Sequence, residues 1–199
     1  MRPIARTTLA LTAVALIAGC DRTPDPAAVE AAATQAAPAP VAEPAAPVQA
    51  EGGLAIEGEG LRIFDAAGAA RALPFGTPQA TVIAAVTAAT GGIAPEQSTN
   101  AECGAGPTQF ARYDDGLQLL FQDEKFAGWF LESPGLTTVD GVGVGTTRAA
   151  LDAARTVTLT PDSTLGIEFS AGDVGGFLTA EGAAGTVESL YAGLTCFFR

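Results

Sequence analysis

Two stretches of the chain share one pattern of small, polar and apolar positions. Residues 75–86 (FGTPQATVIAAV) and 144–154 (VGTTRAALDAA) each place a glycine before a threonine, and apolar residues then follow at helical spacing. Thr77 and Thr146 are the predicted N-caps, with Pro78 at the first helical position of the first copy. The pattern therefore predicts two short, half-buried helices.

Strand-like segments follow both predicted helices. The first helix is followed by TQFARYD, LQLLFQD and FAGWFLE, and the second by TLGIEFS, VGGFLTA and TVESLYAG, with turn signals between the segments. We expect an α+β fold built from tandem units of one short helix plus a three-stranded antiparallel meander, at about 54–135 and 136–199. A hairpin formed by GLRIF and ARALPF is expected to precede the first unit.

Two of these strands contain residues of uncertain orientation. In FAGWFLE, alternation places Phe126 and Phe130 on one face of the sheet and Trp129 on the other. One of these faces must be core, and the other is either covered by a helix or exposed as a docking patch. Phe126, Trp129 and Phe130 are therefore the candidate partner-binding residues. In the second unit, alternation predicts that Glu168 faces solvent while Leu165, Ile167 and Phe169 face the core.

The N-terminus has the features of an export signal. Arg2 and Arg6 precede an apolar stretch at residues 7–18, which is shorter than the roughly 20 residues that span a bilayer. Ile17-Ala18-Gly19-Cys20 resembles the lipobox of bacterial lipoproteins, in which the cysteine becomes the lipidated N-terminus of the mature chain. We expect a signal peptide at 1–19 and acylation of Cys20. The alternatives are a plain secretory signal or an uncleaved N-terminal anchor helix.

The predicted signal and lipidation imply that the protein lies in the cell envelope, anchored in a bilayer through Cys20 and facing the periplasm. In enterobacterial lipoproteins an aspartate after the lipidated cysteine, as at Asp21, is associated with retention in the inner membrane. That rule transfers poorly between bacterial groups, so the sequence does not decide between the inner and the outer membrane.

Residues 20–53 form a segment of different composition. It consists largely of Ala, Pro, Glu, Gln, Thr and Val and contains no aromatic residue. Such a segment cannot bury enough apolar surface to offset its conformational entropy. We expect a disordered tether, stiffened by its prolines, followed by one α+β domain at 54–199.

The charge of the chain restricts its partners. The whole sequence carries a net charge of −12, and residues 54–199 hold seven Lys and Arg against seventeen Asp and Glu. Nucleic acid is excluded as an expected partner because its phosphates are bound by cations.

Cys103 and Cys196 are the thiols that remain once Cys20 is acylated. An even number of cysteines in an exported domain predicts a structural disulfide. A redox pair or a set of metal ligands would be the alternative, but C-x-x-C spacing is absent and the chain contains no histidine. We expect no cofactor and no metal.

Candidate catalytic groups are few. Lys125 is the only lysine and is expected in a hairpin turn, as are the acidic pairs Asp114-Asp115 and Asp123-Glu124. The run GVGVG at 141–145 lacks the lysine of a phosphate-binding loop. We therefore favour a structural role for all of them: the charged residues lie in solvated turns, and the glycine run is a flexible loop that leads into the second helix.

The helix starts carry a family resemblance. A glycine, a threonine cap and a short amphipathic helix ahead of a meander, in a small exported lipoprotein, resemble the BamE/SmpA lipoproteins and the β-lactamase-inhibitor-like fold. The resemblance rests on Gly76-Thr77 with Val82 and on Gly145-Thr146 with Leu151. It implies binding of other envelope proteins, and it places no functional residue of the family on this chain.

The leading hypothesis from the sequence is a membrane-anchored envelope lipoprotein with a non-catalytic domain that binds another envelope protein. The alternatives are an inhibitor of an exported enzyme, which predicts an exposed aromatic loop, and a hydrolase with an unrecognised carboxylate site, which predicts a deep pocket with converging acids.

Overall fold

The structure, a computed structural model, describes residues 53–197. This part of the chain contains two helices and two antiparallel sheets, of three and eight strands. The predicted α+β class is confirmed. The signal peptide, Cys20 and the tether up to residue 52 lie outside the described residues, as do residues 198 and 199.

The smaller sheet contains the predicted hairpin and one further strand. The hairpin pairs β2 (Gly60–Phe64) with β3 (Ala70–Pro74). Its turn is held by Asp65, whose Oδ1 accepts the amide hydrogens of Ala67 (2.9 Å) and Ala69 (2.8 Å). The further strand, β1 (Gly53–Glu57), was not predicted from the sequence and pairs antiparallel with β2.

The first helix is followed by four strands. Helix α1 (Gln79–Ala89) is followed by the edge strand β4 (Glu96–Asn100) and then by the predicted meander of β5 (Thr108–Arg112), β6 (Leu117–Gln122) and β7 (Lys125–Leu131). The sequence EQSTN of β4 has no apolar residue, so its pairing with β5 left no hydrophobic pattern to find.

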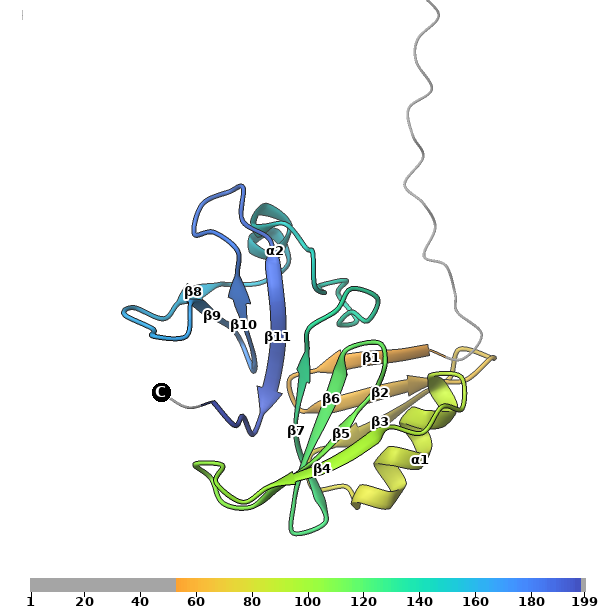
Figure 1. The fold of residues 1–199 in the computed structure, drawn as a ribbon. Helices are drawn as coiled ribbons and strands as arrows, with labels where there is room; N and C mark the ends of the chain where they lie inside the picture. The colour runs from red at the N-terminus through yellow and green to blue at the C-terminus, as the bar shows by residue number, and fades with distance from the viewer. Residues whose placement is uncertain (1–52, 198–199) are drawn as a thin grey trace, which may run out of the picture. The chain divides into compact units, whose positions relative to one another are not determined.

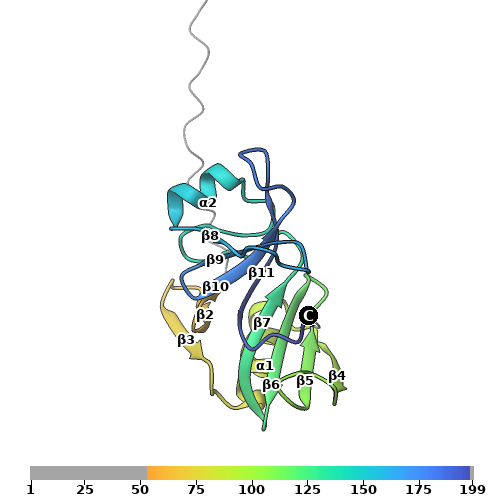
Figure 2. The ribbon, with the colours of Figure 1, turned by 90° about the vertical axis from the view of Figure 1, so that its left-hand side faces the viewer.

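The second helix is also followed by four strands. Helix α2 (Arg148–Ala154) is followed by the two-residue strand β8 (Thr158–Leu159) and by β9 (Ile167–Ala171), β10 (Val174–Leu178) and β11 (Val187–Gly193). Both four-strand sets belong to one sheet in the order β4-β5-β6-β7-β11-β10-β9-β8, so that β7 and β11 join them (Figure 1, Figure 2).

Both helices begin one residue later than predicted. Pro78 rather than Thr77 is the N-cap of α1, and Thr147 rather than Thr146 is the N-cap of α2, where its side chain accepts the amide hydrogen of Ala150 (3.2 Å). The reason is the same in each case. The carbonyl of the predicted cap accepts a strand amide instead, from Phe126 and from Val187 respectively.

These two helix starts bind the last strand of their own meander in the same way. Before α1, the Gly76 amide donates to the Phe126 carbonyl (2.7 Å), the Phe126 amide donates to Thr77 (2.8 Å), and the Gln79 amide donates to Glu124 (2.9 Å). Each Gly-Thr segment thus adds a short bridge to the meander that follows it.

The matching bonds before α2 involve the same relative positions. The Gly145 amide donates to the Val187 carbonyl, the Val187 amide to Thr146, and the Arg148 amide to Gly185, each at 2.8 Å. The common sequence pattern seen in the two helix starts therefore corresponds to a common hydrogen-bonding pattern.

The orientation of β7 differs from the simple alternation predicted for it. Phe126 pairs with Phe121, and Gly128 pairs with Leu120, which leaves Ala127 as an extra residue in a β-bulge. The bulge turns Phe126 to the same face as Trp129, so their predicted placement on opposite faces was wrong. Only Phe130 of the three aromatic residues faces away from the core.

The core lies between the inner face of the larger sheet, the smaller sheet and the two helices. Trp129 is 0% exposed, and its indole Nε1 donates to the carbonyl of Glu57 in β1 (2.8 Å), which connects the two sheets. Val82 and Val86 of α1 and Leu151 of α2 are buried against the same core. One face of the larger sheet is thereby covered, and the site described next lies on the other.

Candidate functional site

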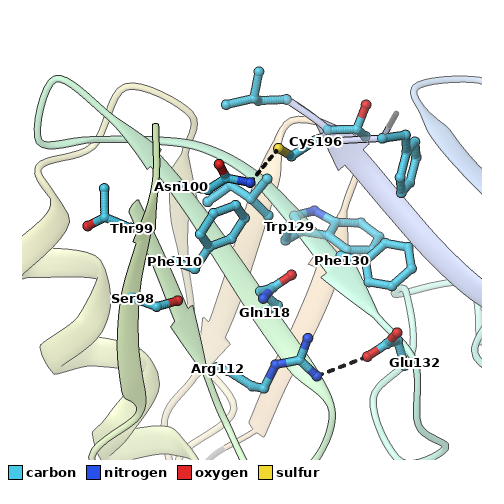
Figure 3. A pocket seen from close by; sticks show the side chains of 14 residues that line it. Ser98, Thr99, Asn100, Phe110, Arg112, Gln118, Trp129, Phe130, Glu132 and Cys196 are labelled. Carbon is cyan, nitrogen blue, oxygen red and sulfur yellow. Dashed lines mark hydrogen bonds and ion pairs between the residues drawn. The ribbon is translucent and has the colours of Figure 1, made fainter. Parts of the chain in front are cut away.

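A groove of about 380 Å³ lies on the outer face of the first four strands of the larger sheet (Figure 3). Its floor is formed by Phe110 of β5, Gln118 and Leu120 of β6, and Phe130 of β7. The polar edge strand β4 forms one wall through residues 98–100. This combination of half-buried aromatic rings and polar borders is typical of a binding surface.

The other wall is the segment that follows β11, residues 194–197, which we call the C-terminal strap. The amide of Leu194 donates to the carbonyl of Ala127 (2.8 Å), so the strap is fixed to β7 at the bulge. Gly128 is required there, because a Cβ atom at this position would clash with the carbonyl oxygen of Leu194.

Two contacts hold the far end of the strap. Cys196 lies beside Cys103 of the loop between β4 and β5, with their Cα atoms 5.3 Å apart, a separation that suits a disulfide. The ring of Phe197 packs against Tyr191, Phe177 and Phe130, with centroids at 5.2, 5.6 and 5.8 Å. The strap is therefore part of the folded domain and gives the groove a fixed wall.

One ion pair stands at the end of the groove. Arg112 of β5 donates from Nη1 to Oε2 of Glu132 (3.1 Å), and both side chains are about half exposed. An exposed pair of this kind adds little stability, so either side chain can exchange its partner for a ligand group. Glu132 is the one carboxylate among the residues that line the groove.

The structure divides the three sequence-predicted partner-binding residues. Phe126 (1% exposed) and Trp129 (0% exposed) are core residues. Trp129 borders the groove in Figure 3, but because it is fully buried its side chain, like that of Phe126, offers no surface to a partner. Phe130 is half-buried on the outer face and lines the groove. The sequence analysis missed Phe110 and the attachment of the strap to β7. The available signal for Phe110 was its large aromatic side chain on the face of the strand TQFAR opposite to that of Ala111, which lies in the core.

Glu168 is buried at 3% exposure, so its predicted position facing solvent was wrong. It does lie on the outer face of the sheet, as alternation requires, but that face is covered in the second half. Its carboxylate accepts hydrogen bonds from the hydroxyls of Tyr191 (2.7 Å) and Ser163 (2.8 Å). Ser163 belongs to the loop between β8 and β9, which closes over this end of the sheet.

The shortest ion pair of the described residues lies away from the groove. Arg155 at the end of α2 binds Asp140 through Nη2 (2.6 Å) and Nε (2.7 Å), and the hydroxyl of Thr138 donates to the same carboxylate. These contacts lower the pKa of Asp140 to about 2, chiefly through the hydrogen bond from Arg155. This is a structural link between a loop and a helix end.

The other charged residues considered in the sequence lie at turns. Lys125 is exposed at the start of β7, after a turn formed by Asp123 and Glu124. Residues 53–197 hold no cluster of three or more potential metal ligands. Among the helices of that same part of the chain, none is long and apolar enough to cross a membrane.

Comparison with protein-family models, with curated proteins and with solved structures gave no match to this chain. The functional interpretation therefore depends on the groove and on the sequence features described above.

Proposed function

We propose that this protein is an envelope lipoprotein, anchored through acylated Cys20, whose domain binds another envelope protein without catalysing a reaction. The observation that carries the proposal is the groove on the outer face of β4 to β7. It exposes parts of Phe110 and Phe130 between the polar strand β4 and the C-terminal strap, and aromatic side chains are preferred anchors at protein interfaces.

The rigidity of the groove supports a binding role. Its floor consists of paired strands, and its strap wall is attached at Leu194, at Cys196 and at Phe197. A preformed surface loses little conformational entropy when it binds a partner. The resemblance to BamE/SmpA lipoproteins, whose usual work is to bind envelope proteins, agrees with the same proposal.

We further propose that the two halves of the domain are copies of one unit, each with a helix and an antiparallel meander. The three matching backbone bonds at each Gly-Thr segment support this. So does a second bulge: in β11 the pairs Phe177–Ser189 and Leu178–Val187 leave Glu188 as the extra residue, as Ala127 is in β7. The match in backbone detail goes beyond a shared order of elements.

Site-specific photo-crosslinking in the native envelope tests the binding proposal. A photo-reactive amino acid in place of Gln118, on the floor of the groove, should give one recurrent adduct with a protein of the envelope. The same substitution at Glu181, exposed in the loop before β11, serves as the control and should give none. Absence of a groove-specific adduct at native expression would count against the proposal.

The anchor has its own readout in the same preparation. Mass spectrometry of the mature chain should find the N-terminus at Cys20 with fatty acids attached, and Cys20→Ala should release the domain from the membrane fraction. An unmodified chain that starts at another residue would remove the lipoprotein part of the proposal.

A further inference from the structure

The two halves of the larger sheet are related by a local twofold arrangement centred on β7 and β11. Phe130 pairs with Tyr191, and the flanking pairs are Trp129 with Ala192 and Leu131 with Leu190. The sequence separation of Phe130 and Tyr191 equals that of the two bulge residues, Ala127 and Glu188. Phe130 and Tyr191 are therefore equivalent positions that meet at the centre of the arrangement.

The same relation matches the neighbouring strands. Leu120 and Phe177 each occupy the first pair beyond the bulge, opposite Gly128 and Ser189. The outer face thus holds two equivalent pairs of side chains. The first half contributes Leu120 and Phe130, and the second half contributes Phe177 and Tyr191. Their surroundings differ.

In the second half the chain itself covers the pair. Phe197 packs edge-on against Tyr191, with an interplanar angle of 78°, and against Phe177, with an angle of 75°. It is carried there by the strap, a segment without regular secondary structure. In the first half Phe197 also contacts Phe130, with ring centroids 5.8 Å apart, and Leu120 is buried at 3% exposure. Phe130 nevertheless stays half-buried and lines the groove together with the half-buried Phe110.

We infer that the groove takes up a non-helical segment of the partner protein that inserts a phenylalanine or tyrosine ring beside Phe130, in the manner in which Phe197 packs beside Tyr191. This inference rests on the proposed binding function and specifies the partner's chemistry. Edge-to-face ring contacts with the exposed parts of Phe130 and Phe110 provide the affinity. Phe110, which takes the position of Glu168 in the second half, makes the first-half site more apolar.

The charge of the domain adds a second requirement. Residues 54–199 carry ten more acidic than basic side chains, so association is favoured when Lys or Arg flanks the inserted ring. The chain's own terminus, LTCFFR at residues 194–199, has this composition. It therefore provides the sequence of a suitable probe peptide.

The probe is the synthetic peptide LTSFFR, in which serine replaces the cysteine so that no disulfide exchange occurs. It is titrated into the isotope-labelled full chain and followed by NMR. Saturable shifts should be confined to the residues around Phe110, Gln118 and Phe130. A control peptide with alanine for both phenylalanines should bind at least about tenfold more weakly, since it lacks the ring that fills the groove.

A pair of protein variants localises the binding. Phe110→Asp places a charge on the groove floor and should weaken binding of the probe at least about tenfold. Ile93→Asp, a matched change at a residue that is 63% exposed and does not line the groove, should leave binding unchanged. Thermal melts establish that both variants are folded.

The outcomes separate this inference from the proposed function. If the probe gives no saturable shifts at millimolar concentration, or if the alanine peptide binds equally well, the inference is wrong. A groove-specific adduct in the crosslinking experiment would then still support a protein-binding function with a different kind of ligand. Loss of that adduct as well would remove both.

Discussion

At the scale of single residues, the ion pair of Arg155 and Asp140 shows how a side chain fixes a loop that has little apolar content. The loop before α2 approaches the core through Val142, and its Thr138 is buried with its hydroxyl bonded to both Asp140 and Val142. The guanidinium of Arg155 completes this network and also donates to the carbonyl of Ala171 (3.4 Å). One arginine thus connects the loop, the end of α2 and strand β9.

Replacing Asp140 with asparagine should lower the free energy of unfolding by about 1 kcal/mol at pH 7. The pKa of Asp140 falls from 3.8 to about 2 in the folded state, which corresponds to about 2 kcal/mol by linkage. Its side chain is 37% exposed, so screening by solvent reduces this value. Urea unfolding of both proteins at several pH values measures the difference.

The pH dependence has a definite sign. Because the folded-state pKa of Asp140 is depressed, its contribution is present above about pH 4 and is lost as the pH falls through about 2. The wild-type protein and Asp140→Asn should therefore converge in stability over that window. Asp152→Asn, which breaks the exposed pair with Arg148, is the control and should cost only a few tenths of a kcal/mol. An equal cost for both variants would contradict the assignment.

Glu168 illustrates why one residue could not be placed from its strand pattern. The alternation of Ile167, Glu168 and Phe169 assigned the faces of β9 correctly, with Phe169 in the core. Whether the outer face is exposed to solvent depends on the β8–β9 loop and on Tyr191, which do not belong to the strand pattern of β9. A buried carboxylate needs hydrogen-bond donors, and these come from Ser163 and Tyr191.

At the scale of elements, the two bulges decide the registers of the last strand in each meander. Each bulge directly follows the strand residue, Phe126 or Val187, whose amide and carbonyl both bond a Gly-Thr segment. A bulge increases local twist and reorients the side chains beyond it. This places Trp129 and Leu190 in the core and leaves Phe130 and Tyr191 on the outer face.

The hairpin turn between β6 and β7 stores strain that a substitution can release. Asp123 and Glu124 have positive φ angles of 48° and 58°, a conformation that favours glycine at the second position of a two-residue hairpin loop. We expect Glu124→Gly to raise the free energy of unfolding by about 0.5 to 1 kcal/mol. Chemical denaturation measures the change.

The control for this turn is a glutamate with ordinary backbone geometry. Glu102 is exposed and has no positive φ angle, so Glu102→Gly relieves no strain and should leave the protein equally or less stable. If both glycine variants gave the same change, the stabilisation at the turn could not be attributed to its positive φ angle.

The elements also show how far the sequence alone could reach. Apolar periodicity and turn residues predicted both helices, the six meander strands and the β2–β3 hairpin. These patterns did not reveal β1. They missed β4 because EQSTN is entirely polar, and β8 because a strand of two residues is too short to show a period. Thr77 and Thr146 satisfied the rules for an N-cap, yet their carbonyls are used by Phe126 and Val187, which are far along the chain. The groove is formed by segments that are distant in sequence. Of the residues on its floor, the sequence analysis therefore proposed only Phe130 as a partner-binding residue.

At the scale of the whole described domain, one continuous sheet is built from two meanders that meet through their last strands. This arrangement gives both halves a common core on one face. It also brings the chain's end, after β11, next to the first half of the sheet. The strap can therefore cross from the second half to Cys103 in the first, and it covers the outer face unequally. The local twofold arrangement and the open groove are consequences of this single topology.

The contact of Cys196 with Cys103 should make the strap's position dependent on oxidation. The two cysteines are 93 residues apart, and a bridge over a loop of that length stabilises a fold by roughly 4 to 5 kcal/mol on the chain-entropy model. In the native oxidised protein we expect neither residue to react with an alkylating reagent, and we expect peptide mass spectrometry to recover the linked pair. Alkylation of both residues without prior reduction would contradict the pairing.

Reduction then provides the energetic measurement. A reductant, or the double change Cys103→Ser and Cys196→Ser, should lower the free energy of unfolding by roughly 3 to 5 kcal/mol. The reductant should have no further effect on the double variant, which serves as the control. Since Phe197 is held over Tyr191 and Phe177 by the same strap, the loss of the bridge should also speed hydrogen exchange in residues 194–197 before it affects β6 and β7. Unchanged exchange in the strap of the double variant would mean that ring packing alone holds this wall of the groove.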